Sequence, residues 1–321
     1  KPESREKLSL ELGGYPTFGD YKTALETVQP DAVSINTYPD THSEYIQMAL
    51  NADCHVFVEK PLALTVEDAQ QLVDLALEKG KKMVVGYILR VHPAWEKFVE
   101  VARNLGKPLV MRMNLNQQSS GAHWHTHKQL MKSMSPIVDC GVHYVDIIHF
   151  VTGAKPLRVT AVGQKNFLKN NGVDTFDAIE TVIEWKKGTN TFSSTFLCNW
   201  IDPNNTSAVS YQSVKFIGTK GRIESDQKNR GLQLVTDREG IEDINPYFNQ
   251  NYTIENNVFF KGYGIESFLQ FFQDCNLIFE CKKSPKYFDN IRPTFSNSIH
   301  SVSVIEAVNK SLKNDGKWIR L

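Results

Sequence analysis

The regular alternation of amphipathic helices and short apolar strands between residues 21 and 87 is the feature that most constrains the fold. The pattern predicts helices at 21–28, 42–52 and 65–80, and strands at 31–38, 55–60 and 82–87. Strands that alternate with helices of this length form a parallel, doubly wound sheet with right-handed crossovers. Such a sheet binds its ligand at the carboxyl ends of its strands. We therefore expect a binding site near residues 36–38 and 59–60.

The helix expected at 65–80 has recognisable ends. Thr65 is suited to the N-cap with Asp68 at the third position, and Gly80 is suited to stop the helix. Its apolar residues follow helical spacing: Val66, Ala69, Leu72, Val73, Ala76 and Leu77.

The start of the alternating region differs from a complete dinucleotide-binding fold. Such a fold opens with a strand and a glycine-rich turn that holds the pyrophosphate. Here Gly13-Gly14 stands in a polar stretch before Tyr15-Pro16, which indicates a turn rather than a phosphate cradle. We expect residues 1–88 to form an incomplete Rossmann-type domain whose first strand and glycine-rich turn are absent from this sequence.

The second part of the chain, residues 89–321, has a different pattern. Long strands separated by turns such as Lys187-Gly188 and Thr219-Lys220-Gly221 favour a large, mostly antiparallel sheet. The expected strands are 109–118, 157–166, 178–188, 190–200, 208–218, 221–226 and 231–237. Helices are expected at 135–153, 266–277 and 294–312. The fold class is thus α/β followed by α+β, with the second domain expected to bind substrate and to form oligomer contacts.

Charge and cysteine content narrow the possible partners. The 36 basic residues balance the 36 acidic residues, so nucleic acid and anionic membranes are not expected to bind. No apolar run approaches the roughly 20 residues that span a bilayer, and residues 1–10 do not read as a signal peptide. The 5 cysteines form no C-x-x-C pair, which favours a reducing, cytoplasmic location. A small neutral substrate fits this composition.

Glu59-Lys60-Pro61 is the strongest local signal. Because proline disfavours helical geometry at the residue before it, Lys60 is expected at the strand tip, where α/β sheets bind ligands. An ammonium group there can donate to a substrate oxygen and stabilise the negative charge that develops on it during hydride transfer. The alternative is a solvated loop lysine beside a turn proline.

The helix at 135–153 carries a second candidate pair. Ser135 is suited to the N-cap and Pro136 to the first helical position. Asp139 and His143, four residues apart, share a helix face, and the helix dipole favours an ionised Asp139. His143 could accept a hydroxyl proton, with Asp139 orienting it or bonding a neighbouring hydroxyl. The alternative is an ordinary surface pair, with Asp146 one turn further along in a structural role.

Three histidines alternate with other residues in the segment 121–127. On a strand, His123, His125 and His127 would share one face, as metal ligands can. Because no cysteine or carboxylate completes a ligand set there, we predict no metal site. We predict instead a loop at the mouth of the substrate site. In it, Trp124 stacks on a sugar ring or packs so that it shields the site from solvent.

The chain resembles the glucose-fructose oxidoreductase/inositol dehydrogenase (Gfo/Idh/MocA) family. The resemblance lies in residues 31–64, with the strand and turn DAVSINTYPDTH and the stretch HVFVEKP, and in the D-x-x-x-H helix at 135–146. It continues through residues 86–98, 218–224 and the closing helix, and so spans nearly the whole chain.

The resemblance implies a dehydrogenase that uses NAD or NADP. It places Lys60 at both nicotinamide and substrate, and Asp139 and His143 at the acid–base step. The residues expected to border the cofactor are Asn36, Thr37, Tyr38, His42 and Glu59. The chain departs from the family's usual Thr-Pro-Asn turn, because Thr37-Tyr38-Pro39 stands there.

Arg90 follows the last strand of the parallel sheet. We place it at the cofactor, and the alternative is an ion pair with a carboxylate across the domain junction.

The predicted reaction is hydride transfer between the nicotinamide and a hydroxyl-bearing carbon of a sugar or polyol. Two alternatives stay open: a truncated, non-catalytic binding or assembly protein of the same fold, and an NAD-dependent glycosidase. A homo-oligomer, a dimer or a tetramer, is expected through the exposed face of the antiparallel sheet.

Overall fold

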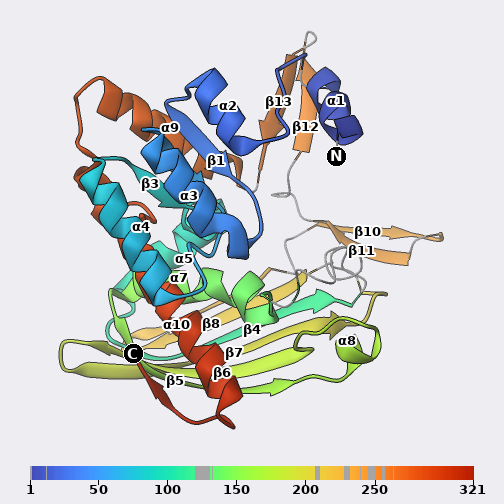
Figure 1. Ribbon diagram of the computed structural model, residues 1–321. Helices are drawn as coiled ribbons and strands as arrows, with labels where there is room; N and C mark the ends of the chain where they lie inside the picture. Colours follow the sequence, from blue (N-terminus) through green and yellow to red (C-terminus); the bar gives the residue numbers. More distant parts are fainter. Residues whose placement is uncertain are drawn as a thin grey trace.

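The computed structural model describes residues 2–11, 13–119, 131, 133–206, 210–227, 232–238, 240–244, 250–254, 257–262 and 264–321. The chain builds a small parallel sheet with helices beside it and then a large sheet with helices on one face (Figure 1). This is the two-part architecture that the sequence pattern predicted. Among the described residues, no helix combines the length and the apolar character needed to cross a membrane.

The first sheet contains three parallel strands in the order β1-β2-β3. Strand β2 is buried along its whole length, as expected of the central strand of a parallel sheet. The elements of this part are α1 (Pro2–Glu11), α2 (Tyr21–Val28), β1 (Ala32–Ile35), η1 (Pro39–Thr41), α3 (His42–Asn51), β2 (His55–Val58), α4 (Val66–Glu78) and β3 (Met83–Val85).

Local signals set the ends of α4 as predicted. The Thr65 hydroxyl accepts a hydrogen bond from the Asp68 backbone N–H at 3.1 Å, which caps the first turn. Gly80 has a φ of +63°, a left-handed conformation that glycine adopts without strain. Gly13 and Gly14 also have positive φ angles, in agreement with the predicted turn.

The large sheet has seven strands in the order β14-β5-β6-β7-β4-β8-β9. Every neighbouring pair is antiparallel except β4 and β7, which run parallel. Its strands are β4 (Pro108–Gln118), β5 (Lys155–Gln164), β6 (Ala178–Lys187), β7 (Asn190–Asp202), β8 (Ser210–Gly218), β9 (Gly221–Asp226) and β14 (Ile319–Arg320). Two hairpins lie outside it, β10 (Leu232–Thr236) with β11 (Gly240–Ile244) and β12 (Gln250–Ile254) with β13 (Asn257–Lys261).

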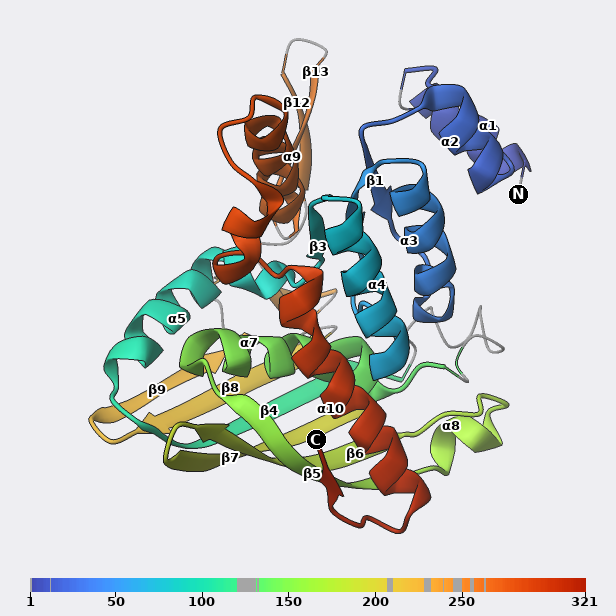
Figure 2. The same ribbon diagram turned by 60° about the vertical axis from the view of Figure 1, so that its left-hand side comes forward.

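Three helices lie along one face of the large sheet, α5 (Pro93–Asn104), α7 (Val142–Thr152) and α10 (Phe295–Lys313) (Figure 2). The short elements η2 (Ile88–Val91), α8 (Phe167–Asn170) and η5 (Pro285–Asn290) connect the larger ones. Because α10 also packs against α4, the end of the chain holds the two parts together.

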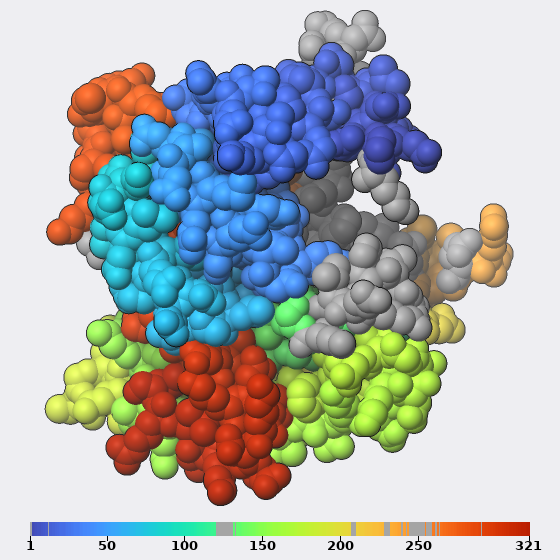
Figure 3. Space-filling model, in the orientation of Figure 1, coloured from blue at the N-terminus to red at the C-terminus, as the bar shows by residue number. Residues whose placement is uncertain are grey.

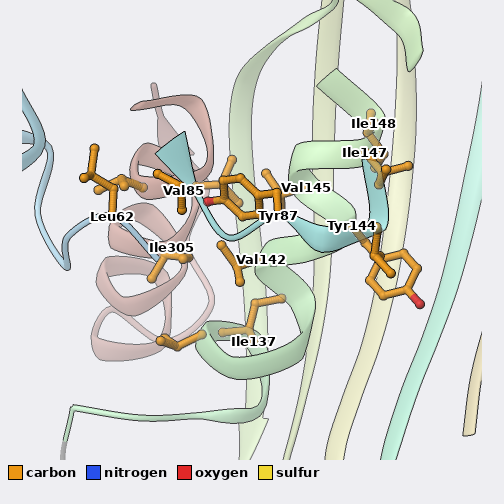
Figure 4. Packing of buried hydrophobic residues seen from close by; sticks show 14 of the residues in the cluster. Leu62, Val85, Tyr87, Ile137, Val142, Tyr144, Val145, Ile147, Ile148 and Ile305 are labelled. Atoms are coloured by element: carbon orange, nitrogen blue, oxygen red, sulfur yellow. The ribbon is translucent and has the colours of Figure 1, made fainter. Parts of the chain in front are cut away.

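One hydrophobic cluster is continuous between the two parts. Figure 4 shows Leu62 and Val85 from the first part packed near Val142 and Val145 of α7 and Ile305 of α10. All five side chains are fully buried. Burial of this kind contributes about 25 cal/mol for each Å² of apolar surface removed from water.

The chain returns to the first sheet near its end. In α9 (Ile265–Phe279), Phe268 and Phe271 pack on Phe57 of β2. The space-filling view shows α9 in orange beside the blue and cyan N-terminal residues (Figure 3). Asp274 of α9 forms a buried ion pair with Lys82, so the return of the chain is fixed by charge as well as by packing.

Candidate functional site

A cavity of about 310 Å³ lies at the carboxyl ends of β1 and β2, where the sequence predicted a site. One side is polar and the other is mostly apolar. The residues that line it are Asn36, Thr37, Tyr38, Pro39, Glu59, Lys60, Met131, Met134, Asp139 and Trp200. The cavity therefore joins the tips of the parallel strands to the helix and strands of the second part.

The turn after β1 supplies one wall. The Asn36 side-chain amide donates to the Ser34 hydroxyl at 2.9 Å, and the Thr41 hydroxyl donates to the Thr37 hydroxyl at 2.8 Å. These bonds are local, so they fix the turn that carries Asn36, Thr37 and Tyr38 to the cavity edge.

His42 lies behind this wall rather than in the lining. Its ring is fully buried, with Nδ1 2.7 Å from the Pro61 carbonyl oxygen and Nε2 3.1 Å from the Thr37 carbonyl oxygen. Burial lowers the pKa of His42, although both carbonyls favour its charged form. The side chain thereby ties the turn after β1 to the segment after β2.

Lys60 follows β2, and its peptide bond to Pro61 is cis. Its ammonium nitrogen donates to the Asp139 carbonyl oxygen at 2.7 Å and to the Asp139 carboxylate at 2.8 Å. The side chains of Lys60 and Asp139 are 16% and 18% exposed, so the pair is largely shielded but still reaches the cavity. The structure thus brings two of the predicted site residues together across 79 positions of sequence.

The charges around Lys60 keep it protonated. Burial is the largest single effect and lowers the pKa of Lys60, but the neighbouring negative groups, Asp139 first and Glu59 after it, together raise the pKa above its ordinary value. Burial raises the pKa of the Glu59 carboxyl, against the opposing charge of Lys60. Lys60 is therefore a hydrogen-bond donor at neutral pH and not a base.

Asp139 sits in a π-helical segment, η4 (Ile137–Gly141), where the sequence predicted an ordinary α-helix. The Ser135 hydroxyl lies 3.5 Å from the Val138 backbone N–H, at the N-cap position that was predicted. In this wide π-helical turn, a Cβ atom on Gly141 would lie 2.4 Å from the end of the Ile137 side chain, which would have to shift to admit it. Widened turns of this kind occur often at functional sites, and they depend on packing that periodicity does not show.

His143 begins the next turn, in α7, and is partly buried. Its Nδ1 atom is buried and has no hydrogen-bond partner among the described residues. Burial, reinforced by the Lys60 charge, lowers the pKa of His143 to about 3, which leaves the ring neutral at pH 7. His143 is not among the residues that line the cavity, and the Asp139 carboxylate pairs with Lys60.

Arg90 occupies the second of the two places considered for it. Its guanidinium forms a bidentate ion pair with Asp146 of α7, with N–O distances of 2.7 and 2.6 Å, and it lies over the Phe150 ring. Both charged side chains are at most 5% exposed. Arg90 is not among the residues that line the cavity, and the structure shows the ion pair across the junction that was the alternative, while its predicted contact with the cofactor stays a prediction.

Several lining residues were not singled out from the sequence. Met131, Met134 and Trp200 form the apolar side of the cavity, and Pro39 completes the turn after β1. Trp200 is near the end of β7, and the strand order, with β7 beside β4, brings it to the cavity that Lys60 also borders. Trp124 and the histidines at 123, 125 and 127 lie outside the described residues.

The cavity fits the nicotinamide end of a dinucleotide. It lies where doubly wound sheets bind such cofactors, and the Asn36 amide, the Thr37 hydroxyl and the Glu59 carboxyl border it. The cation of Lys60 adds a hydrogen-bond donor at the cavity, whereas the buried Nδ1 of His143 lies outside its lining.

Two family models match the chain. Residues 2–87 match the "Oxidoreductase family, NAD-binding Rossmann fold" model, and residues 101–224 match the "GFO/IDH/MocA C-terminal domain" model. Together the two matches cover more than half of the chain.

Two curated relatives and one solved structure support the same family assignment. The UDP-N-acetylglucosamine 3-dehydrogenase of Acidithiobacillus ferrooxidans is 31% identical over 140 residues, which are 41% of this chain and 39% of that protein. The chain thus matches well under half the length of this relative. The myo-inositol 2-dehydrogenase of Thermotoga maritima is 25% identical over 245 residues, which are 74% of this chain and 68% of that protein.

The scyllo-inositol dehydrogenase of Lactobacillus casei, solved with NAD(H) and scyllo-inositol, shares the fold with a TM-score of 0.74 at 18% identity. The superposition covers 100% of this chain and 88% of that structure. With both family models matched in order along the sequence, the chain belongs to the Gfo/Idh/MocA family of oxidoreductases.

Proposed function

We propose that the protein is an NAD-dependent dehydrogenase that oxidises a hydroxyl-bearing carbon of a sugar or polyol, or reduces the corresponding carbonyl. The observation that carries the proposal is the pair of Lys60 and Asp139 at the cavity, at the carboxyl ends of the parallel strands. Names of relatives support the substrate class, because they include inositol and sugar dehydrogenases.

Lys60 would bind the substrate oxygen. An ammonium group has three hydrogens, and the Asp139 carbonyl and carboxylate accept two of them. The third remains to hydrogen-bond a substrate oxygen, whose developing negative charge the cation would stabilise. Asp139 holds the ammonium in place through two atoms of one residue.

His143 would take the hydroxyl proton. Its ring is neutral at pH 7, as the proton acceptor in alcohol oxidation must be, but burial and the Lys60 charge make it a weak base. NAD, when bound, accepts the hydride from the same carbon, so that an alcohol and NAD⁺ give a carbonyl, NADH and one proton. Asn36, Thr37, Tyr38 and Glu59 would border the nicotinamide.

A screen of sugars and polyols tests the proposal. The full-length protein is incubated with NAD or NADP and with myo-inositol, scyllo-inositol, glucose or methyl glucoside, and NADH or NADPH is followed by absorbance. We expect reduction of the cofactor with at least one substrate and loss of at least about 100-fold in kcat/KM in Lys60→Ala and His143→Ala. Lys97→Ala is the matched control, because Lys97 forms an exposed ion pair with Glu100 on α5 and does not line the cavity.

The outcomes separate the competing functions. Activity that neither substitution affects would exclude the proposed roles of Lys60 and His143. Absence of turnover with every substrate and both cofactors would favour a non-catalytic protein of this fold. Release of nitrophenol from a nitrophenyl glycoside without net cofactor reduction would instead indicate a glycosidase.

We also propose a homo-oligomer formed through the face of the large sheet opposite α5, α7 and α10. Figure 2 shows these helices together on one face. Along β6, buried residues alternate with more exposed ones, and because successive side chains point to opposite faces, the more exposed ones lie on the face that the helices do not cover. Size-exclusion chromatography that returned a monomer at micromolar concentration would contradict this.

A further inference from the structure

The apolar side of the cavity has one large aromatic group, Trp200. The side chain is only 1% exposed to solvent, yet it borders the same cavity as Lys60 and Asp139. It belongs to a small cluster with Met131, Leu168 and Val173 that is separate from the main core. Trp200 is thus held firmly in a wall whose other neighbour is the ligand space.

Gln117 fixes the indole ring. The indole N–H of Trp200 donates to the Gln117 side-chain carbonyl oxygen at 2.7 Å. Gln117 lies where the parallel pairing of β4 and β7 changes register, between the pairs Asn116–Asn199 and Gln118–Asp202. Irregularities of this kind redirect side chains at the ends of strands, and here the result is a direct bond to the ring.

We propose that Trp200 is the residue against which the C–H face of a cyclic substrate rests, and that Gln117 is a positioning residue for its ring. The inference rests on the proposed function and adds the ring form of the substrate to it. A cyclic polyol with equatorial hydroxyls carries its hydroxyls around its rim and only C–H groups on its faces. The rim would then meet Lys60 and Asp139, while C–H groups of one face pack against the part of the indole that borders the cavity.

Trp185 provides a matched contrast. It is also fully buried, and its indole N–H donates to the Ser194 hydroxyl at 2.8 Å, but it stacks on Phe192 and does not line the cavity. Both tryptophans are thus buried and hydrogen-bonded by a side chain of the same sheet. Only Trp200 is placed to contact a substrate.

The test compares Trp200→Leu and Trp200→Phe with Trp185→Phe. For scyllo-inositol, or for the best cyclic substrate of the screen, we expect Trp200→Leu to raise KM about 10-fold with kcat changed less than about 3-fold. Trp200→Phe should have a smaller effect because it keeps an aromatic ring. The KM for NAD should not change, and Trp185→Phe should leave both KM values unchanged while lowering thermal stability.

The positioning role of Gln117 is tested with one variant that removes the hydrogen-bond acceptor and a second that keeps it. Gln117→Leu removes the acceptor and should raise the KM for the cyclic substrate several-fold, whereas Gln117→Glu keeps an acceptor oxygen and should restore most of the affinity. Sorbitol, an acyclic polyol with no ring face, should be affected less than the cyclic substrate by Trp200→Leu. Equal effects of Trp200→Leu and Trp185→Phe on KM, or equal effects on cyclic and acyclic substrates, would overturn the inference.

Binding gives a readout that does not need turnover. Addition of scyllo-inositol or myo-inositol should raise the unfolding temperature of the wild-type protein, and Trp200→Leu and Gln117→Leu should lose that increase. If the wild-type protein binds a cyclic polyol but reduces no cofactor, the proposed function fails while the role of Trp200 stands. An unchanged thermal shift in folded Trp200→Phe, Trp200→Leu and Gln117→Leu would reject the role of Trp200 even if the enzyme is active.

Discussion

Two ion pairs join residues that follow the strands of the parallel sheet to the same helical segment, and they differ in how far their side chains are exposed to solvent. Lys60, after β2, pairs with Asp139, and Arg90, after β3, pairs with Asp146. The N–O distances are similar, 2.8 and 2.6 Å, but the side chains of the first pair are 16% and 18% exposed and those of the second are 5% and 1% exposed. The same combination of charges therefore borders a cavity in one place and closes a junction in the other.

The difference in exposure follows from the chemistry of the two cations. The planar guanidinium of Arg90 matches both oxygens of Asp146, and its face is covered by the Phe150 ring. The ammonium of Lys60 meets one carboxylate oxygen and one main-chain oxygen of Asp139, which leaves a hydrogen for a ligand. A lysine with a free hydrogen is suited to a cavity that binds a ligand, and a fully paired arginine is suited to a buried contact between two parts of a structure.

The sealed pair should have the larger effect on stability. Asp146→Ala leaves the Arg90 charge buried without its partner, so we expect the free energy of unfolding to fall by about 3–5 kcal/mol. Urea unfolding followed by circular dichroism measures this loss. Asp139→Ala is the matched comparison and should cost less, because Lys60 has more access to water. Equal losses in the two variants would mean that exposure does not distinguish the pairs.

The exposed pair should have the larger effect on catalysis. Lys60→Met removes the donor to the substrate oxygen while keeping an unbranched side chain, and we expect kcat to fall by about 10²–10³-fold, or about 2.7–4 kcal/mol in activation free energy. Stability should change by less than in Asp146→Ala. Steady-state kinetics together with urea unfolding of both variants would show the two effects separating. A Lys60→Met enzyme that unfolds easily but turns over normally would reverse the assignment of the pairs.

Much of the fold could be predicted because its signals are local. The helix at 66–78 begins after a Thr65 cap and is followed by Gly80, and the parallel strands appear as short apolar runs between helices. Strands β4 to β9 of the large sheet were predicted from alternation and turns, whereas β14 was not, and the strand predicted at 231–237 in this sheet lies in a separate hairpin with β11. Their order, with β7 lying parallel to β4, depends on packing between distant segments and could not be obtained from local patterns.

The candidate site also contains some residues that the sequence indicates and others that only the folded structure brings together. Lys60 and Asp139 could be singled out because the EKP stretch and the D-x-x-x-H helix resemble the family's pattern, whereas their spacing alone also allowed an ordinary loop lysine and surface pair. Their direct contact, the π-helical turn at Asp139 and the sealed Arg90–Asp146 pair arise only when the two parts pack together. Trp200 gave no local signal, since a tryptophan at a strand end is ordinary in a core.

Asp139→Asn removes the negative charge from the exposed ion pair and keeps the shape of the side chain. The Asp139 carboxylate is the main group that raises the pKa of Lys60 against the lowering effect of burial. Without it, the pKa of Lys60 should fall, and the alkaline limb of the kcat/KM profile should move to lower pH. We expect about a 10-fold loss of activity at neutral pH, since the main-chain acceptor still holds the ammonium. A profile identical to that of the wild type would show that Asp139 does not set the ionisation of Lys60.

His143 lies between the two carboxylates in the sequence of the helical segment and should add a slope to the pH dependence of stability. Its pKa is lowered to about 3 in the folded protein by burial and by the Lys60 charge, whereas the unfolded chain takes up the proton near pH 6.5. Below pH 6.5 the unfolded state therefore binds more protons than the folded state, and stability falls as pH decreases from 6.5 toward 3. The slope contributed by one such histidine is at most about 1.4 kcal/mol per pH unit. Urea unfolding between pH 7 and 4.5 should thus show a shallower decline in His143→Gln than in the wild-type protein, and parallel declines would mean that folding does not lower the pKa of His143.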